Sequence, residues 1–249
     1  MHYLGGRTFG PLVTAGTVFA SLFSGYAVVG IPNEAFRYGW SALRWIPQGA
    51  AYSAGVAGAG VRLRKASLVR NHQTAVDFMT DRYQSQVLRY TIVLLQILPS
   101  LIFLAAQVGA LKQTINSIFG LDLDAVYPVI LIMFLILLFE WAGGLSSVAI
   151  TDVIQGIVMI TSFTFLSVVV KKNFGGWVDL DPNIYPRKDF YQTPSTETQI
   201  GMWQFSLINI SVFTLPQFMQ RNYAARDLKS LKVGWLACEF AHVVNFPIF

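Results

Sequence analysis

The sequence predicts an all-α membrane protein, a polytopic helical bundle, and three observations support this fold class. Hydrophobic residues make up 54% of the 249 residues and charged residues only 12%, whereas soluble domains carry about 25% charged residues. Long apolar segments recur along the whole chain, and most basic residues gather in a few of the connectors between them. This pattern is expected of a chain that crosses a bilayer several times.

Seven segments are apolar enough to be membrane spans, although any one of them taken alone could be a buried core helix. A tight inner turn at Gly143-Gly144 is expected between the fourth and the fifth, and residues 171–201 are expected to form an extracellular loop. The expected spans lie approximately at residues 10–31, 38–61, 90–111, 126–142, 147–170, 202–219 and 233–249.

The distribution of basic residues predicts the orientation of the chain. If the spans are counted as above, 11 of the 18 basic residues lie on the same side as Arg7. Cytoplasmic connectors carry an excess of Lys and Arg, so this side is expected to be the cytoplasmic one. The net charge of +5 is therefore interpreted as a topology signal, and no nucleic-acid partner is expected. The protein is expected to be a multi-pass integral protein of the plasma membrane, in contact with the lipid bilayer.

The first span, Gly10 to Ile31, has an unusual composition for a membrane anchor. Its 22 residues contain no charge, and a helix of this length spans roughly 33 Å, about the thickness of the hydrocarbon core. It also contains the pair Ser24-Gly25 near its middle. Small residues allow helices to pack closely, but such a pair can also loosen the backbone and expose carbonyl groups to a cation. The residues alone leave both interpretations open.

Four motifs, in order, resemble the sodium:solute symporter family, and within it most closely the sodium/proline symporters. The motifs are LGGRTFGPLVTAG, VDFMTDRYQS, GGLSSVAITDVIQGIVM and FTLPQFMQRNYAARDLKS. The resemblance covers nearly the whole chain. It implies a broken-helix, inverted-repeat transporter core, in which substrate and sodium lie beside a break in the first core helix. It also implies an incomplete core, because the family continues beyond the helices found here.

The resemblance assigns roles to residues of the first span. The backbone carbonyls of Ala20 and Phe23 would bind sodium, with the remaining ligands coming from hydroxyl residues of a later helix. The unwound turn and substrate site would involve Ser21, Ser24, Gly25 and Tyr26. Sodium is the expected coupling ion, and no other cofactor or metal is expected. The sodium/proline symporters carry an aspartate where this chain has Leu22, so the identity of the small-molecule solute stays open.

Asp152 is an acidic residue a few positions inside an expected span, and Gln155 follows it at i+3 on the same expected helix face. An acid at membrane depth costs about 2.5–3.5 kcal/mol on insertion scales, so it should face protein or water. One interpretation is a cytoplasmic gate or ion-path contact formed by both residues. The other is a structural role for Asp152, as a helix cap or as the partner of a loop arginine. Arg221 is expected to lie in cytoplasmic water.

The sequence contains no phosphate-binding glycine loop, no cluster of metal ligands and no nucleophile–base pair, so an enzyme is not expected. The expected function is sodium-coupled symport of a small organic solute, such as proline or another amino acid. The alternatives are a passive channel or facilitator, and a non-transporting or truncated relative of the family.

Overall fold

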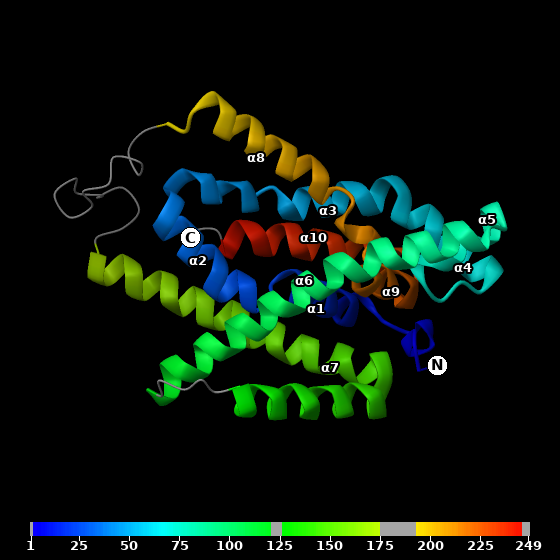
Figure 1. Cartoon of the computed structure of the whole chain (residues 1–249), viewed down its shortest axis with the longest axis horizontal. Coiled ribbons are helices and arrows are strands. Elements are labelled where there is room, and N and C mark those ends of the chain that lie inside the picture. The colour runs from blue at the N-terminus through cyan, green and yellow to red at the C-terminus, as the bar shows by residue number, and fades with distance from the viewer. Residues whose placement is uncertain (1, 121–125, 175–192, 246–249) are drawn as a thin grey trace.

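The computed structural model describes residues 2–120, 126–174 and 193–245, and these residues form a helical bundle (Figure 1). The α-helices are α1 (Pro11–Leu22), α2 (Ile31–Tyr38), α3 (Gln48–Gly55), α4 (Val61–Arg70), α5 (Ala75–Tyr83), α6 (Gln86–Phe119), α7 (Val126–Phe174), α8 (Thr196–Asn209), α9 (Pro216–Ala224) and α10 (Leu228–Asn245). Short 3₁₀ and π segments connect them: η1 (Gly5–Arg7), η2 (Tyr26–Gly30), η3 (Gly39–Trp45), η4 (Val56–Gly60) and η6 (Val212–Thr214). The expectation of an all-α fold is confirmed for the described residues.

Helix α1 lies at the centre of the bundle, where it packs mainly against α10 and α7. Small residues permit this close packing. A Cβ atom at Gly16 would lie 2.7 Å from the Val153 side chain of α7, and one at Gly234 would lie 2.9 Å from the Thr14 side chain. The side chain of Thr14 is completely buried. The sequence therefore brings the backbones of α7 and α10 directly against α1.

Helix α7 consists of two arms, and Figure 1 shows the chain reversing its direction between them, with the arms spreading apart from a common turn. The turn lies at Gly144, whose φ of 60° and ψ of −164° are outside the helical region and suit glycine. The amide of Leu145 donates a hydrogen bond of 3.0 Å to the carbonyl of His2, which attaches the turn to the start of the chain. The tight turn expected at Gly143-Gly144 is present.

Two helical segments of the described chain are long and apolar enough to cross a membrane, α6 and Tyr127–Asn173 of α7, or three if the bent pair at α1 counts as one span. Large aliphatic side chains on α6, including Leu94, Leu101 and Ile102, are more than half exposed. Such a surface is suited to lipid or to further apolar helices. The other expected spans coincide with shorter or broken helices. Residues 175–192 of the expected extracellular loop and 246–249 of the last span lie outside the described residues.

The expected span 202–219 is divided in the structure. Helix α8 ends at Asn209, a short 3₁₀ turn follows, and α9 begins at Pro216, the first-turn position that proline favours. We expected this segment to pack against the first span. Of its two helices, α9 packs on α1, whereas α8 packs on α3 and η3.

Candidate functional site

The first span is broken at Phe23 to Gly25. Helix α1 ends with the hydrogen bond from the Phe23 amide to the Phe19 carbonyl, 2.8 Å, and Phe23 has a non-helical ψ of 78°. A π-helix begins at Tyr26, and the segments on the two sides are bent by 50°. The last four carbonyl groups of an α-helix accept no hydrogen bond from amides of the same helix. Here these carbonyls, from Ala20 to Phe23, lie next to the break.

The side chain of Gln107 on α6 binds both residues of the break. Its Nε2 atom donates to the Ser24 hydroxyl oxygen at 2.9 Å, and its Oε1 atom accepts from the Gly25 amide at 2.9 Å. A Cβ atom at Gly25 would lie 3.1 Å from both the Ala110 Cβ and Gln107 Oε1. Glycine therefore allows α6 to approach the backbone closely enough for this amide to replace a missing helical hydrogen bond.

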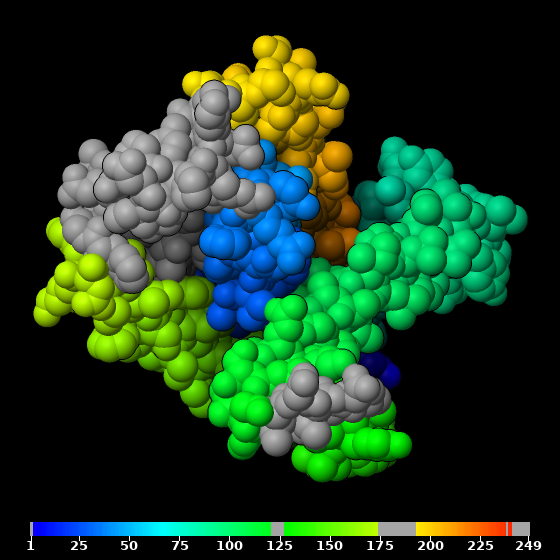
Figure 2. All heavy atoms as spheres, turned by 60° about the vertical axis from the view of Figure 1, so that its left-hand side comes forward, coloured from blue at the N-terminus to red at the C-terminus, as the bar shows by residue number. Residues whose placement is uncertain are grey.

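A buried carboxylate stabilises the outer part of the span. Glu34 on α2 is 7% exposed, and its Oε1 atom lies 2.9 Å from Nε of Arg44. The indole of Trp45 donates to Oε2 at 3.0 Å, and the Tyr26 hydroxyl donates to the same atom at 3.4 Å. The Arg44 guanidinium also lies over the Phe205 ring of α8, 5.0 Å from its centroid. Figure 2 shows α2 at the middle of this end of the molecule, between α8 and α6.

A small cavity of about 50 Å³ lies beside the break, between it and η3. Phe23, Ala27 and Ile31 line one side of it. Trp45 and Gln48 line the other side. Most of the lining is apolar, and the amide of Gln48 adds a group that can both donate and accept hydrogen bonds.

On the N-terminal side of the break, a buried ion pair connects three helices. Nη2 of Arg221 on α9 lies 2.9 Å from Oδ2 of Asp152 on α7. Thr17 on α1 donates its hydroxyl to the same carboxylate oxygen, and it accepts from Arg221 Nε at 2.7 Å. Arg221 also donates to the carbonyls of Thr17 and Gln217. Thr17 precedes Phe23 by six residues, which is about 9 Å along a helix.

The structure corrects three of the expectations. Arg221 is 8% exposed and partners Asp152, so its expected place in cytoplasmic water is wrong. Gln155 is exposed and does not share the buried face of Asp152, because Gly156 is the residue that packs on α1 there. Ser21 lies in the last turn of α1, not in the unwound turn, and its hydroxyl donates to the Thr17 carbonyl at 2.7 Å. Ser24 and Gly25 do lie in the break.

Four residues of this region were not identified from the sequence as parts of the site: Gln107, Glu34, Thr17 and Arg221. Gln107 is 83 residues from Ser24 along the chain, and Arg221 is 204 residues from Thr17. A polar residue inside an apolar segment was the available signal for Gln107. Its partner could not be read from the sequence, because no local periodicity connects residues so far apart.

Comparisons with known proteins identify the family of the chain. The family model of the sodium:solute symporter family matches residues 2–246. Sodium/proline symporters of Staphylococcus aureus, including those of strains JH9 and COL, are 30% identical over 181 residues, which is 71% of this chain. The chain spans about 35% of the length of these relatives. No solved structure matches it.

The fold and the broken span define the class: a multi-pass, all-helical membrane protein of the broken-helix transporter type. The chain belongs to the sodium:solute symporter family. Members of such a family carry solutes across membranes and are not enzymes.

Proposed function

We propose that the protein containing this chain is a sodium-coupled symporter in the plasma membrane, and that it carries a small organic solute such as proline or another amino acid. The single observation that carries this proposal is the break at Phe23 to Gly25 in a span without charged residues. Carbonyl oxygens beside a break inside a protein-lined cavity are suited to a hard cation such as sodium. The similarity to sodium/proline symporters supports the choice of solute.

We assign sodium binding to the backbone carbonyls of Ala20 and Phe23, with oxygen ligands from elsewhere in the protein completing the shell. Ser24, Gly25 and Tyr26 would contribute to the adjoining substrate site. The cavity beside them, about 50 Å³, is much smaller than the pockets that hold organic ligands. Solute entry would therefore require the Trp45 side of the cavity to move away from the break.

Sodium-dependent uptake is the direct test. The full-length protein in membrane vesicles should accumulate radiolabelled proline or another small amino acid when sodium is outside. Replacing sodium with choline, while the membrane potential is held constant, should abolish accumulation, because neither the bulky choline ion nor a proton can replace a hard cation held by carbonyl oxygens. Equal uptake without sodium would indicate a facilitator, and no uptake of any solute would indicate a non-transporting relative.

A matched pair of glycine variants tests the site itself. Gly25→Ala places a methyl group 3.1 Å from Ala110 and from the Gln107 amide of α6, so it should displace this amide from the break and reduce sodium-dependent uptake. Gly109→Ala adds the same group to α6, where nothing lies within 4 Å, and should leave uptake unchanged. The amount of folded protein in the membrane is measured for both. Equal uptake by the two variants would argue against a site at the break.

For Asp152, we propose a gating role in addition to its structural one, because its ion pair fixes the cytoplasmic half of α1. Asp152→Asn should raise the sodium concentration for half-maximal uptake among the molecules that still fold, because an attraction for the cation is lost. Gln155→Ala provides the control, since Gln155 is exposed and should leave sodium dependence unchanged. Unchanged sodium dependence in Asp152→Asn would refute the gating role.

A further inference from the structure

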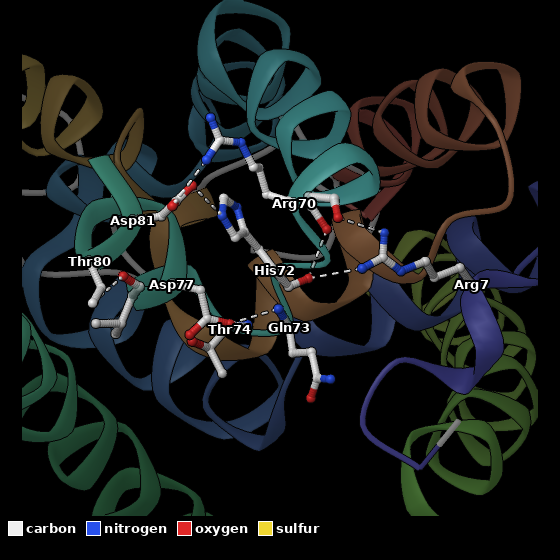
Figure 3. Close-up of polar contacts among 10 residues, drawn as sticks. Arg7, Arg70, His72, Gln73, Thr74, Asp77, Thr80 and Asp81 are labelled. Carbon is white, nitrogen blue, oxygen red and sulfur yellow. Dashed lines mark hydrogen bonds and ion pairs between the residues drawn. The ribbon is translucent and has the colours of Figure 1, made fainter. Parts of the chain in front are cut away.

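A separate, polar hollow lies at the end of the molecule formed by α4 and α5, away from the broken span. It has a volume of about 370 Å³ and lies between the end of α4 and helix α5. Arg70, His72, Asp81 and Arg82 contribute to its lining. Figure 3 shows Arg70, His72 and Asp81 converging there, with Arg7 attached to the neighbouring loop.

Hydrogen bonds fix the loop that carries His72. The Arg7 guanidinium donates to the carbonyls of Ser67 and His72, at 3.0 Å each. The Ser67 hydroxyl donates to the same His72 carbonyl at 2.9 Å. On the other side, Thr74 and Asp77 form a capping box at the start of α5, and the carboxylate of Asp77 accepts from the Thr74 amide at 2.8 Å. The hollow is therefore a preformed feature with a fixed wall.

The charges in the hollow are unbalanced. Asp81 accepts from Arg70 at 3.3 Å and lies 3.2 Å from Nε2 of His72. Arg82 has no ion-pair partner among the residues that the structure describes, and its side chain is exposed. The His72 side chain is 5% exposed, and its Nδ1 atom lacks a hydrogen-bond partner within the described chain. The lining thus contains two guanidinium groups and only one carboxylate, so the hollow can accept a further anion.

The surroundings place this hollow at a membrane surface. The connector 62–89 contains six basic and two acidic residues, on the side that the charge distribution assigns to the cytoplasm. Large apolar side chains on α4 and α5 are exposed next to it, among them Val69 at 82% and Tyr83 at 59%. Basic pockets bordered by apolar surface on the cytoplasmic side are suited to the head groups of anionic lipids.

We propose that the hollow between α4 and α5 binds a phosphate group, held by the guanidinium groups of Arg70 and Arg82. Guanidinium groups match the geometry of phosphate oxygens in pairs of parallel hydrogen bonds. The phosphate comes from an anionic phospholipid of the cytoplasmic leaflet or from free phosphate in the cytoplasm. This site is independent of the sodium and substrate site.

The test uses the whole chain, purified in detergent and titrated with phosphatidylglycerol, with phosphatidylcholine as the zwitterionic comparison. Native mass spectrometry counts the bound lipids. Phosphatidylglycerol should be retained preferentially, and Arg70→Gln or Arg82→Gln should each weaken its binding about fivefold, as expected for one basic residue near a lipid surface. Arg89→Gln removes an exposed charge from the same connector outside the hollow and should have little effect.

For one variant we expect stronger binding of phosphatidylglycerol, a result that misfolding cannot produce. Asp81→Asn removes the carboxylate from the hollow and should tighten phosphatidylglycerol binding about fivefold, because a repelling charge is lost and Arg70 is released for the ligand. Adding millimolar inorganic phosphate separates the two sources. Displacement of the lipid indicates a site for free phosphate, and retention indicates a lipid head-group site.

Three results would overturn the proposal. The first is equal retention of phosphatidylglycerol and phosphatidylcholine. The second is the same loss in Arg89→Gln as in Arg82→Gln, which would mean diffuse attraction to the basic surface. The third is unchanged or weaker binding in Asp81→Asn.

Discussion

The buried ion pair between Asp152 and Arg221 predicts a large loss of stability when one partner is neutralised. In Asp152→Asn the guanidinium of Arg221 would remain buried, with its side chain 9% exposed, but without its counter-ion. Removing one partner of a buried pair costs about 3–5 kcal/mol. Arg221 keeps its bonds to the carbonyls of Thr17 and Gln217, so we expect a value near the lower end, about 3 kcal/mol. For a chain of this length, a loss of about 3 kcal/mol in the free energy of unfolding lowers Tm by about 6–12 °C.

The assay is the loss of monodisperse protein on heating, followed by size-exclusion chromatography in detergent. Asp81→Asn is the matched control. The Asp81 side chain is 39% exposed, and an asparagine there keeps an oxygen that can accept from Arg70 or His72, so the loss of its charge should cost about 1 kcal/mol. The double variant Asp152→Asn/Arg221→Gln removes both charges and should recover part of the lost stability. A Tm for Asp152→Asn as high as that of the control, or a double variant less stable than both single ones, would refute the reasoning.

Three further predictions concern the break, the packing of α1 and the turn between α9 and α10. Gln107→Leu removes two hydrogen bonds from the break, worth up to about 2 kcal/mol, so hydrogen exchange at residues 24–25 should accelerate while α1 stays protected. Gly16→Ala should lower Tm by several degrees because its methyl group would lie 2.7 Å from α7, whereas Gly201→Ala, with open space around it, should not. Hydrogen bonds from the amide and hydroxyl of Ser230 lower the pKa of Asp227 from 3.8 to about 2. The contribution of the ionised Asp227 carboxylate to stability should therefore be present above pH 3.8 and be lost as the pH falls toward 2. Over this pH range, the Tm of Asp227→Asn should change less than the Tm of the unmodified protein.

The sequence predicted features that depend on local chemistry. A Ser-Gly pair in an apolar span, taken together with the resemblance to the symporter family, indicated the break, since such residues weaken a helix without a proline. Two adjacent glycines indicated the turn of α7. The high cost of an unpaired acid at membrane depth indicated that Asp152 needs a partner, and the expected structural role agrees with the ion pair that the structure contains.

Features that depend on distant contacts were missed. Arg221 follows Pro216 at the end of an apolar segment, which is also the pattern of a residue at the membrane surface. Its burial depends on how α9 turns back against α1, and no local pattern records this. The break between α8 and α9 had a weak signal in Asn209 and Pro216, but hydropathy averaged over the segment concealed it. The sodium ligands assigned to the carbonyls of Ala20 and Phe23 stay a prediction.

The contacts of the broken span divide it into two parts with different partners. The part before the break is fixed by α7, α9 and α10, through the ion pair at Thr17 and through close packing at Gly16. The part after it contacts α6 and η3, and its Glu34 cluster extends to α8. A movement that separates these two sets of partners would therefore bend the span at Phe23 to Gly25 and would leave both helical parts intact. Such a bend would change the carbonyl geometry at the break and the size of the adjoining cavity together, which is the physical requirement for coupling a cation to a solute at one site.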